Sequence, residues 1–278
     1  GIIGAEGGNG VGVSGIAPKV SLMVLKYFDP KVKYVDNLQA TIDSLKYATK
    51  MKAHIINYSG GGVVYSKEEF EAISEARRQG ILVVAAAGNE RSDTQKTPFY
   101  PGSYPLDNII SVTAINQEQK ILNSSNWGKK PVHVVAPGKE IFSTLPDNSY
   151  GPLTGTSQAT AFVSGVAALI LAHRPHFTAL DIKNHILNTG DTQKNLVDKT
   201  VTSTRINTYN ALVMLDAGRS VTGLRATNGE RSITTVEPFQ RSPLAENLNQ
   251  FGRLLLEKTG GTANTHVDSI NPQVPIVQ

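Results

Sequence analysis

Ser157 is the residue whose surroundings in this sequence most favour chemistry. It follows Gly155 and Thr156 and precedes a run of small and apolar residues that predicts a buried helix. A hydroxyl at a helix N-terminus lies beside free backbone N–H groups and the positive end of the helix dipole. These groups can stabilise the negative charge that develops when a hydroxyl attacks a carbonyl. The alternative is an ordinary serine N-cap, which is the commoner role of an isolated serine in this setting.

Several segments, in chain order, resemble those of the subtilisin-like serine proteases. Residues 151–175 carry Gly-Thr-Ser, small residues and an aliphatic helix, as the nucleophile segment of that family does. The segment AAAGNE (85–90) is similar to the one that holds the family's oxyanion asparagine, with Asn89 in place. Other segments that resemble the family are 12–29, 55–62, 100–105, 125–144 and 204–212. Together these motifs outweigh the interpretation of Ser157 as a cap.

The resemblance implies a serine endopeptidase that hydrolyses peptide bonds through an acyl-enzyme on Ser157. The Ser157 backbone N–H and the Asn89 side-chain amide would form the oxyanion hole, supported by the Thr156 hydroxyl. A polypeptide substrate is the implied partner, together with a propeptide or an inhibitor. The competing interpretation is a non-catalytic subtilisin-like domain with a binding or regulatory role. The Gly-Thr-Ser segment and Asn89 favour the enzyme, because a binding module does not need an oxyanion hole.

The family's catalytic aspartate and histidine have no counterpart in this sequence. Both precede the serine in that family, and Gly1 resembles the last glycine of the family's His-Gly-Thr-His-Val-Ala-Gly motif. We therefore expect an N-terminally truncated domain that is inactive alone, because Ser157 has no general base. No family position is occupied by any of the histidines, which are His54, His133, His173, His176, His185 and His266.

The resemblance also places a primary specificity pocket. Its walls would pair with extended substrate backbone, and Phe99 lies near the expected floor. We expect Phe99 to narrow the pocket toward small or medium apolar side chains, the alternative being a ring that points into the core. The wall residues implied by the family are Ser59, Gly60, Gly61, Ala86, Ala87 and Gly88.

The expected reaction requires no cofactor, but some family members bind calcium near the segment EGGNGVGV (6–13). Asn9 is the candidate ligand there, and calcium takes about 6–8 oxygens. Residues 10–15 also match G-x-G-x-x-G, a pattern that needs a strand before it and a helix after it to bind a dinucleotide. A strand-like run follows instead, so the segment is interpreted as a glycine-rich loop.

Aliphatic strand-like runs alternate with helical patterns along most of the chain. Strands are expected at 20–27, 54–59, 81–88, 108–115 and 132–136. Helices are expected at 36–51, 157–172 and 179–187. A further helix is expected to begin with a capping box of Ser66 and Glu69. Near-continuous aliphatic strands separated by helices are typical of a parallel sheet covered on both faces. The expected fold is therefore α/β, a three-layer sandwich with a mostly parallel central sheet, as in the subtilisin-like family.

Two parts of the chain differ in composition. Residues 1–217 are expected to form the catalytic domain without its N-terminal part, and 218–278 a linker and C-terminal extension. The extension is polar apart from one predicted helix over 243–259, which Ser242 and Pro243 open and Gly260 closes.

The overall composition excludes several classes of function. A hydrophobic content of 40% is ordinary for a globular core, and without cysteine neither disulfides nor thiolate chemistry is available. The net charge is only +4 and the basic residues are scattered, so no nucleic-acid partner is expected. No uninterrupted apolar run reaches the ~20 residues of a membrane span. Family habit implies a secreted or extracytoplasmic protein.

Overall fold

The structure is a computed structural model that describes residues 1–28 and 36–216. The chain divides into two compact units, 1–233 and 234–278, and the described residues belong to the first. The predicted linker and extension (218–278), with the helix over 243–259, lie outside the described residues and stay a prediction.

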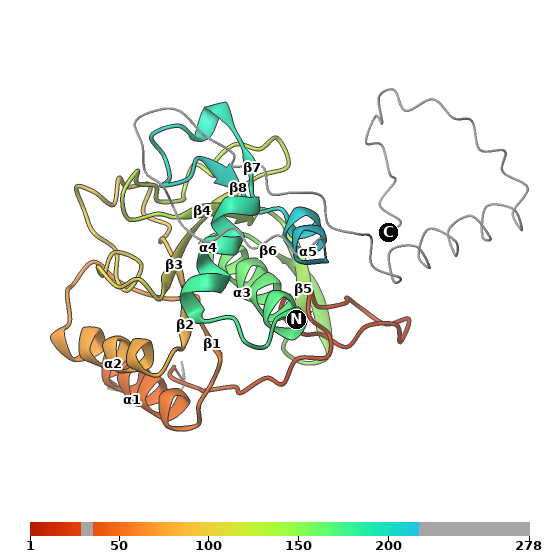
Figure 1. Cartoon of the computed structure of the whole chain (residues 1–278), viewed down its shortest axis with the longest axis horizontal. Coiled ribbons are helices and arrows are strands. Elements are labelled where there is room, and N and C mark those ends of the chain that lie inside the picture. Colours follow the sequence, from red (N-terminus) through yellow and green to blue (C-terminus); the bar gives the residue numbers. More distant parts are fainter. Residues whose placement is uncertain (29–35, 217–278) are drawn as a thin grey trace, which may run out of the picture. The chain divides into compact units, whose positions relative to one another are not determined.

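A six-stranded sheet forms the centre of the first unit (Figure 1). Within this sheet, every described pair of strands is parallel except β7 with β8. Tyr58 pairs with Ala85 in adjacent strands, so the segments that follow both residues leave the sheet at the same edge. The spatial order of the strands is β1 (Ile55–Tyr58), β2 (Leu82–Ala86), β3 (Ile109–Ile115), β4 (Val134–Pro137), β8 (Thr204–Arg205) and β7 (Asp191–Thr192).

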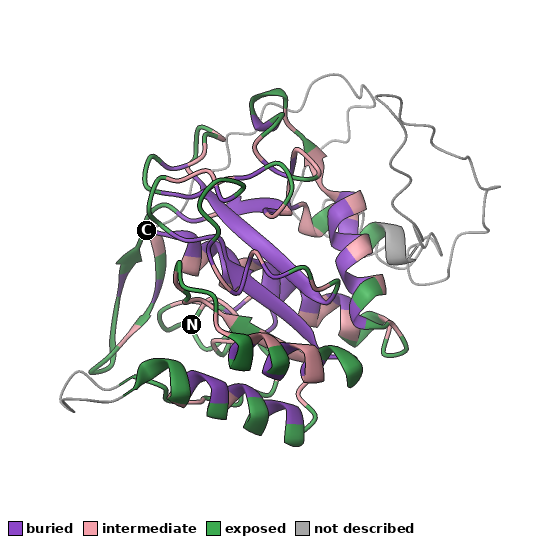
Figure 2. Ribbon diagram, turned by 90° about the vertical axis from the view of Figure 1, so that its left-hand side faces the viewer, coloured by how far each residue is buried: buried purple, intermediate pink, exposed green. Residues whose placement is uncertain are grey.

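Helices cover both faces of this sheet, which confirms the expected three-layer sandwich. One layer holds α1 (Asn37–Lys50) and α2 (Lys67–Arg78). The other holds α3 (Thr156–His173), α4 (Ala179–Thr189) and α5 (Thr208–Asp216). A short 3₁₀ helix spans Lys194–Leu196. β2 and β3 are buried along their whole length between the layers (Figure 2).

The alternation of side chains along β2 divides the core into two clusters. Leu82 and Val84 pack with residues of α3 and α4 such as Val163 and Ile186. Val83 and Ala85 point the other way and pack with residues of α1 and α2, including Ile42, Leu45 and Ile73. Because successive side chains of a strand point to opposite faces, a fully apolar strand is what a sheet covered on both faces requires.

α3 is the central helix of the fold. It is long and apolar enough, with a mean hydropathy of 1.2, to resemble a membrane span by length and composition. However, it packs against β1, β2, β3 and β4, and half of it is buried inside the fold. A core helix has the same composition, so this helix is weak evidence for a membrane.

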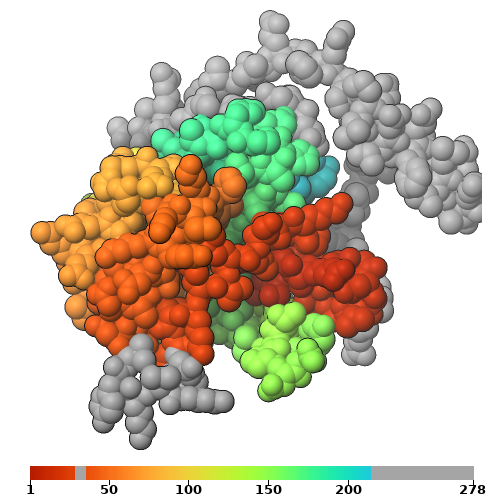
Figure 3. All heavy atoms as spheres, turned by 90° about the horizontal axis from the view of Figure 1, so that it is seen from below, coloured from red at the N-terminus to blue at the C-terminus, as the bar shows by residue number. Residues whose placement is uncertain are grey.

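The prediction of a buried strand at 20–27 is wrong. The structure assigns no strand there, and Val24 and Leu22 are 87% and 53% exposed. The described sheet begins at β1, and no described strand pairs with this segment, so its apolar side chains have no sheet layer to enter. Figure 3 shows residues 1–28 on the surface beside the antiparallel hairpin of β5 (Ile141–Leu145) and β6 (Ser149–Leu153).

The predicted capping box at α2 is half formed. Ser66 accepts a hydrogen bond from the Glu69 N–H, as expected. The Glu69 carboxylate, however, accepts hydrogen bonds from the hydroxyls of Tyr58 (2.5 Å) and Tyr104 (2.8 Å). Burial and the nearby Glu69 charge raise the pKa of both tyrosines, which therefore remain neutral donors.

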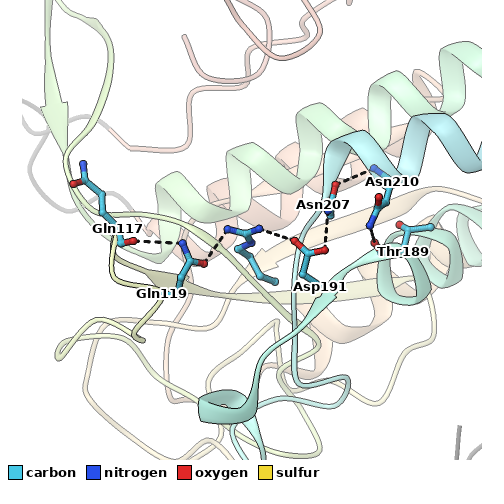
Figure 4. A network of polar contacts seen from close by, with 7 residues as sticks. Gln117, Gln119, Thr189, Asp191, Asn207 and Asn210 are labelled. Carbon is cyan, nitrogen blue, oxygen red and sulfur yellow. Dashed lines mark hydrogen bonds and ion pairs between the residues drawn. The ribbon is translucent and has the colours of Figure 1, made fainter. Parts of the chain in front are cut away.

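A polar network fastens the far edge of the sheet (Figure 4). Arg205 of β8 donates to Asp191 of β7 at 2.6 Å and to Gln119 at 3.0 Å. Asn207 donates to the second Asp191 oxygen, and Asn210 extends the network to the Thr189 carbonyl at the end of α4. The network joins β7, β8, α4 and α5 through side chains where the strands are only two residues long.

Candidate active site

Ser157 lies in the first turn of α3 but does not cap the helix. The N-cap is Gly155, which has φ +152° and no side chain with which to cap the helix. The Ser157 hydroxyl instead donates a hydrogen bond to the carbonyl of Ser59, which follows β1, at 2.8 Å. The interpretation of Ser157 as an ordinary N-cap is therefore wrong, and its backbone N–H is among those that a helix leaves without an intrahelical acceptor.

Ser59 and Ser157 are joined in both directions. The Ser59 hydroxyl donates to the Ser157 carbonyl at 3.0 Å and accepts from the Asn57 amide at 2.9 Å. Asn57 in turn accepts from the Ser164 hydroxyl, two turns along α3, at 2.9 Å. This chain of side chains fixes the first turn of α3 against the end of β1.

Asn89 lies beside the same helix turn, as the sequence predicted. Its side-chain oxygen accepts from the Thr156 N–H at 3.0 Å and from the Thr156 hydroxyl at 3.2 Å. Because Oδ1 accepts both hydrogen bonds, the other end of the carboxamide, Nδ2, points away from Thr156. Thr156 is fully buried, so its hydroxyl contributes by holding the Asn89 amide.

Phe99 lies between the two predicted pocket walls. It is 8% exposed. A Cβ added to Gly61 would lie 2.5 Å from the Phe99 ring, and one added to Gly88 would lie 2.8 Å from it. The backbone of Tyr100 pairs with that of Gly62 in both directions, at 2.7 and 2.9 Å, which holds the segment in place. The ring thus contacts one residue of each predicted wall, Gly61 and Gly88, and the pocket formed by Ser59, Gly60, Gly61, Ala86, Ala87 and Gly88 stays a prediction.

Asn126 is a residue of this region that the sequence analysis did not single out. It is 1% exposed, and its side chain hydrogen-bonds to the loop that carries Asn89. The signal available in the sequence was its place in the segment Ser-Asn-Trp-Gly, which resembles the family without indicating a role.

The described histidines have other surroundings. His133 accepts from the Ser111 N–H at 2.9 Å, and burial, with the charge of Lys183, lowers its pKa to about 3. His185 contacts the Ala211 carbonyl at 2.7 Å. His173 ends α3, ~24 Å from Ser157 at the rise of an α-helix. His54 precedes β1, whereas Ser59 follows it. Within the described ranges, the Ser157 hydroxyl is bonded to a carbonyl oxygen and to no histidine.

The loop around Asn9 provides few ligands for a metal ion. The Asn9 side-chain oxygen accepts from the Val11 N–H at 3.0 Å. In the part of the chain that the structure describes, no three acidic, histidine or cysteine side chains gather to hold a metal. These residues do not by themselves meet the oxygen count that calcium needs, so the calcium site stays a prediction.

Comparisons with known proteins agree on one family. The family model described as the subtilase family matches residues 1–206. Subtilisin-like protease 2 of Plasmodium falciparum is 38% identical over 174 residues, which are 61% of this chain and 13% of that protein. Subtilisin DY of Bacillus licheniformis is 37% identical over 182 residues, 65% of this chain and 65% of that protein. The chain thus spans less than two thirds of either relative.

Solved structures agree with the sequence comparisons. A mutant of the protease domain of PatA superposes with a TM-score of 0.66 and 27% identity, covering 76% of this chain and 77% of that one. The similarity to known proteases therefore extends from the sequence to the fold.

Proposed function

The chain belongs to the subtilase family, and on that premise we propose that Ser157 is the nucleophile of a serine endopeptidase centre with Asn89 in its oxyanion hole. The observation that supports this most is the fixed orientation of Asn89 by Thr156, the residue next to the nucleophile. Because Thr156 engages the Oδ1, the Nδ2 donors of Asn89 are left for a substrate oxygen, as an oxyanion hole requires. The proposed substrate is a polypeptide.

In the proposed reaction the Ser157 Oγ attacks the carbonyl carbon of the scissile peptide bond. Negative charge then develops on the carbonyl oxygen, where the Ser157 N–H and the Asn89 Nδ2 would donate hydrogen bonds. The positive end of the α3 dipole adds to this stabilisation. Loss of one such donor in a serine protease costs about 10²–10³-fold in kcat.

The attacking hydroxyl must also lose its proton. In this chain the proton is directed at the Ser59 carbonyl, which can orient the hydroxyl but is too weak a base to remove the proton. We therefore propose that the 278-residue chain hydrolyses peptides very slowly until a general base reaches Ser157. This placement of the proton also favours the second candidate, a subtilase domain that binds polypeptides without cleaving them.

Phe99 is the proposed determinant of the primary pocket. Its ring lies against Gly61 and Gly88, so the space left between the walls suits small or medium apolar side chains. Gly60 adds no side chain to that wall, and a Cβ there would lie 3.4 Å from the Tyr58 ring. A propeptide or inhibitor that places an extended segment along the same walls remains a predicted partner, and an extracytoplasmic location remains a prediction.

Labelling of Ser157 with a fluorophosphonate tests the proposal. The reaction would be followed with and without added imidazole, which can replace a missing histidine as the base. We expect the label on Ser157, faster with imidazole and absent from Ser157→Ala. Labelling that is equal in Ser157→Ala would contradict the proposal, and no labelling under either condition would favour the non-catalytic candidate.

A further inference from the structure

The loop that carries Asn89 is held through contacts with other segments, for example by the Arg91 N–H, which donates to the Ser124 carbonyl at 2.8 Å. Asn89 is exposed and follows Gly88, whose φ of +99° is a conformation that glycine favours. Segments of this kind move unless neighbouring groups hold their backbone. An amide that must point at one place therefore needs a contact that fixes the loop on both sides of it.

Asn126 provides that contact. Its Nδ2 donates to the Ala87 carbonyl at 2.8 Å and to the Glu90 carboxylate at 2.6 Å. Its Oδ1 accepts from the backbone N–H groups of Glu90 at 3.0 Å and Ser92 at 2.9 Å. Both donors and both acceptor positions of the carboxamide are thus in use.

The backbone of Asn126 adds to the same contact. Its N–H donates to the Gly88 carbonyl at 3.0 Å, and its own carbonyl accepts from the Thr113 hydroxyl of β3 at 2.5 Å. The hydrogen bonds therefore reach residues before and after Asn89 and connect them to the interior of the sheet. A Cβ added to Gly88 would collide with the Asn126 Nδ2, which shows how closely the Asn126 side chain approaches the Gly88 backbone.

We propose that Asn126 is a positioning residue that sets the direction of the Asn89 amide through the loop 87–92. The inference rests on the proposed role of Asn89 in the oxyanion hole. Asparagine is the residue that fits, because the site needs two donors and two acceptors at once. Aspartate has the same shape but would place a carboxylate beside the Ala87 carbonyl and the Glu90 carboxylate.

Amide hydrogen exchange in the full chain tests the inference without catalysis. The Thr156 N–H reports on Asn89, whose side-chain oxygen is its acceptor. The Ile206 N–H, which donates to Val135, reports on the sheet. We expect Asn126→Asp to raise the exchange rate of Thr156 about tenfold more than that of Ile206, as the loss of one hydrogen bond predicts.

Asn108→Asp is the matched control. Asn108 is also buried, and its amide also donates to a backbone carbonyl, that of Ile81 at 2.9 Å, away from the loop. We expect this variant to change both exchange rates by the same factor. An unchanged ratio of Thr156 to Ile206 exchange in folded Asn126→Asp would overturn the inference.

A measurement on the unchanged chain covers the case in which Asn126→Asp does not fold. The ¹⁵N order parameter of the Asn89 side-chain amide should be near the ~0.85 of rigid backbone, and a value below about 0.6 would overturn the inference. Neither readout uses Ser157. A positioned Asn89 amide with an unreactive Ser157 would therefore contradict the proposed function and leave this inference standing.

Discussion

The backbone nitrogen of Thr156 and the side-chain oxygen of Asn89 lie 3.0 Å apart, in a hydrogen bond that joins α3 to the loop after β2. The two residues are 67 positions apart in the sequence. Because β1 and β2 are parallel, their following segments leave the sheet at one edge, where the first turn of α3 lies between them. The parallel sheet is thus the reason that Ser59 and Asn89, which follow different strands, both reach the first turn of α3.

Asn89→Asp tests the roles of the two ends of the Asn89 side chain separately. The variant keeps an oxygen for the Thr156 N–H but replaces the Nδ2 donors with a second oxygen. We expect little change in the melting temperature and a fall of about 10²–10³ in the rate of fluorophosphonate labelling of Ser157. A labelling rate equal to that of the unchanged chain would remove Asn89 from the oxyanion hole.

Phe99→Ala is expected to enlarge the primary pocket. Peptidyl phosphonates with alanine or phenylalanine at the position next to the reactive phosphorus would be compared. We expect the unchanged chain to react faster with the alanine compound and Phe99→Ala to reverse that order. The variant should also lose about 3–5 kcal/mol of stability, as buried Phe→Ala changes do. Equal reaction of the unchanged chain with both compounds would place the ring outside the pocket.

Lys183 is expected to make stability depend on pH in the alkaline range. It is 7% exposed and donates to the Ile109 carbonyl at 2.6 Å. Burial lowers its pKa from 10.5 to about 8, although Asp107 acts in the opposite direction. Between these pH values Lys183 holds its proton more in the unfolded chain than in the folded one, so its contribution to the free energy of unfolding should rise from pH 8 to 10.5. Calorimetry should show this rise in the difference between the unchanged chain and Lys183→Met, and no such pH-dependent difference for the exposed control Lys67→Met.

Arg205→Met is expected to loosen the far edge of the sheet. Burial raises the pKa of Asp191, but the hydrogen bonds from Arg205 and Asn207 outweigh it, so that pKa lies below its ordinary value. The pair therefore stabilises the fold above the unfolded pKa of about 4, and the contribution is lost as the pH falls through the lowered pKa. Denaturant unfolding at pH 7 should show a loss of about 1–3 kcal/mol, and the loss should become smaller in acid. A constant difference at all pH values would contradict this account.

Most of the fold could be predicted from the sequence, because its strands are continuous runs of aliphatic residues and several of its helices begin at a capping side chain. The helix predicted over 36–51, for example, is α1, and Asp36 caps it by accepting from the Leu38 and Gln39 N–H groups. The segment 20–27 has the same aliphatic character, yet it lies exposed. Composition predicts that a segment can form a buried strand, but burial also requires a neighbouring strand to pair with. Whether such a strand is present depends on the rest of the fold and cannot be read from the segment itself.

The residues of the candidate site could be predicted from the sequence, but the hydrogen bonds that hold them in place could be predicted less well. Ser157, Thr156 and Asn89 come together as the motifs indicated. Asn126 was not foreseen, because the partners of its side chain lie 34 to 39 residues earlier and a buried asparagine has no local pattern. The partner of Glu69 was missed for a similar reason, since the tyrosines that bind it come from other segments.

The attachment of the Asn89 oxygen to Thr156 has an energetic consequence for the proposed reaction. The dipole of this carboxamide is oriented by the fold itself, so it need not rotate as charge moves onto the substrate oxygen. In water, solvent dipoles would have to turn during the same step, and that reorganisation is part of the uncatalysed barrier. The free energy needed to orient the Asn89 dipole is thus supplied during folding, and the dipole does not have to be reoriented in each turnover.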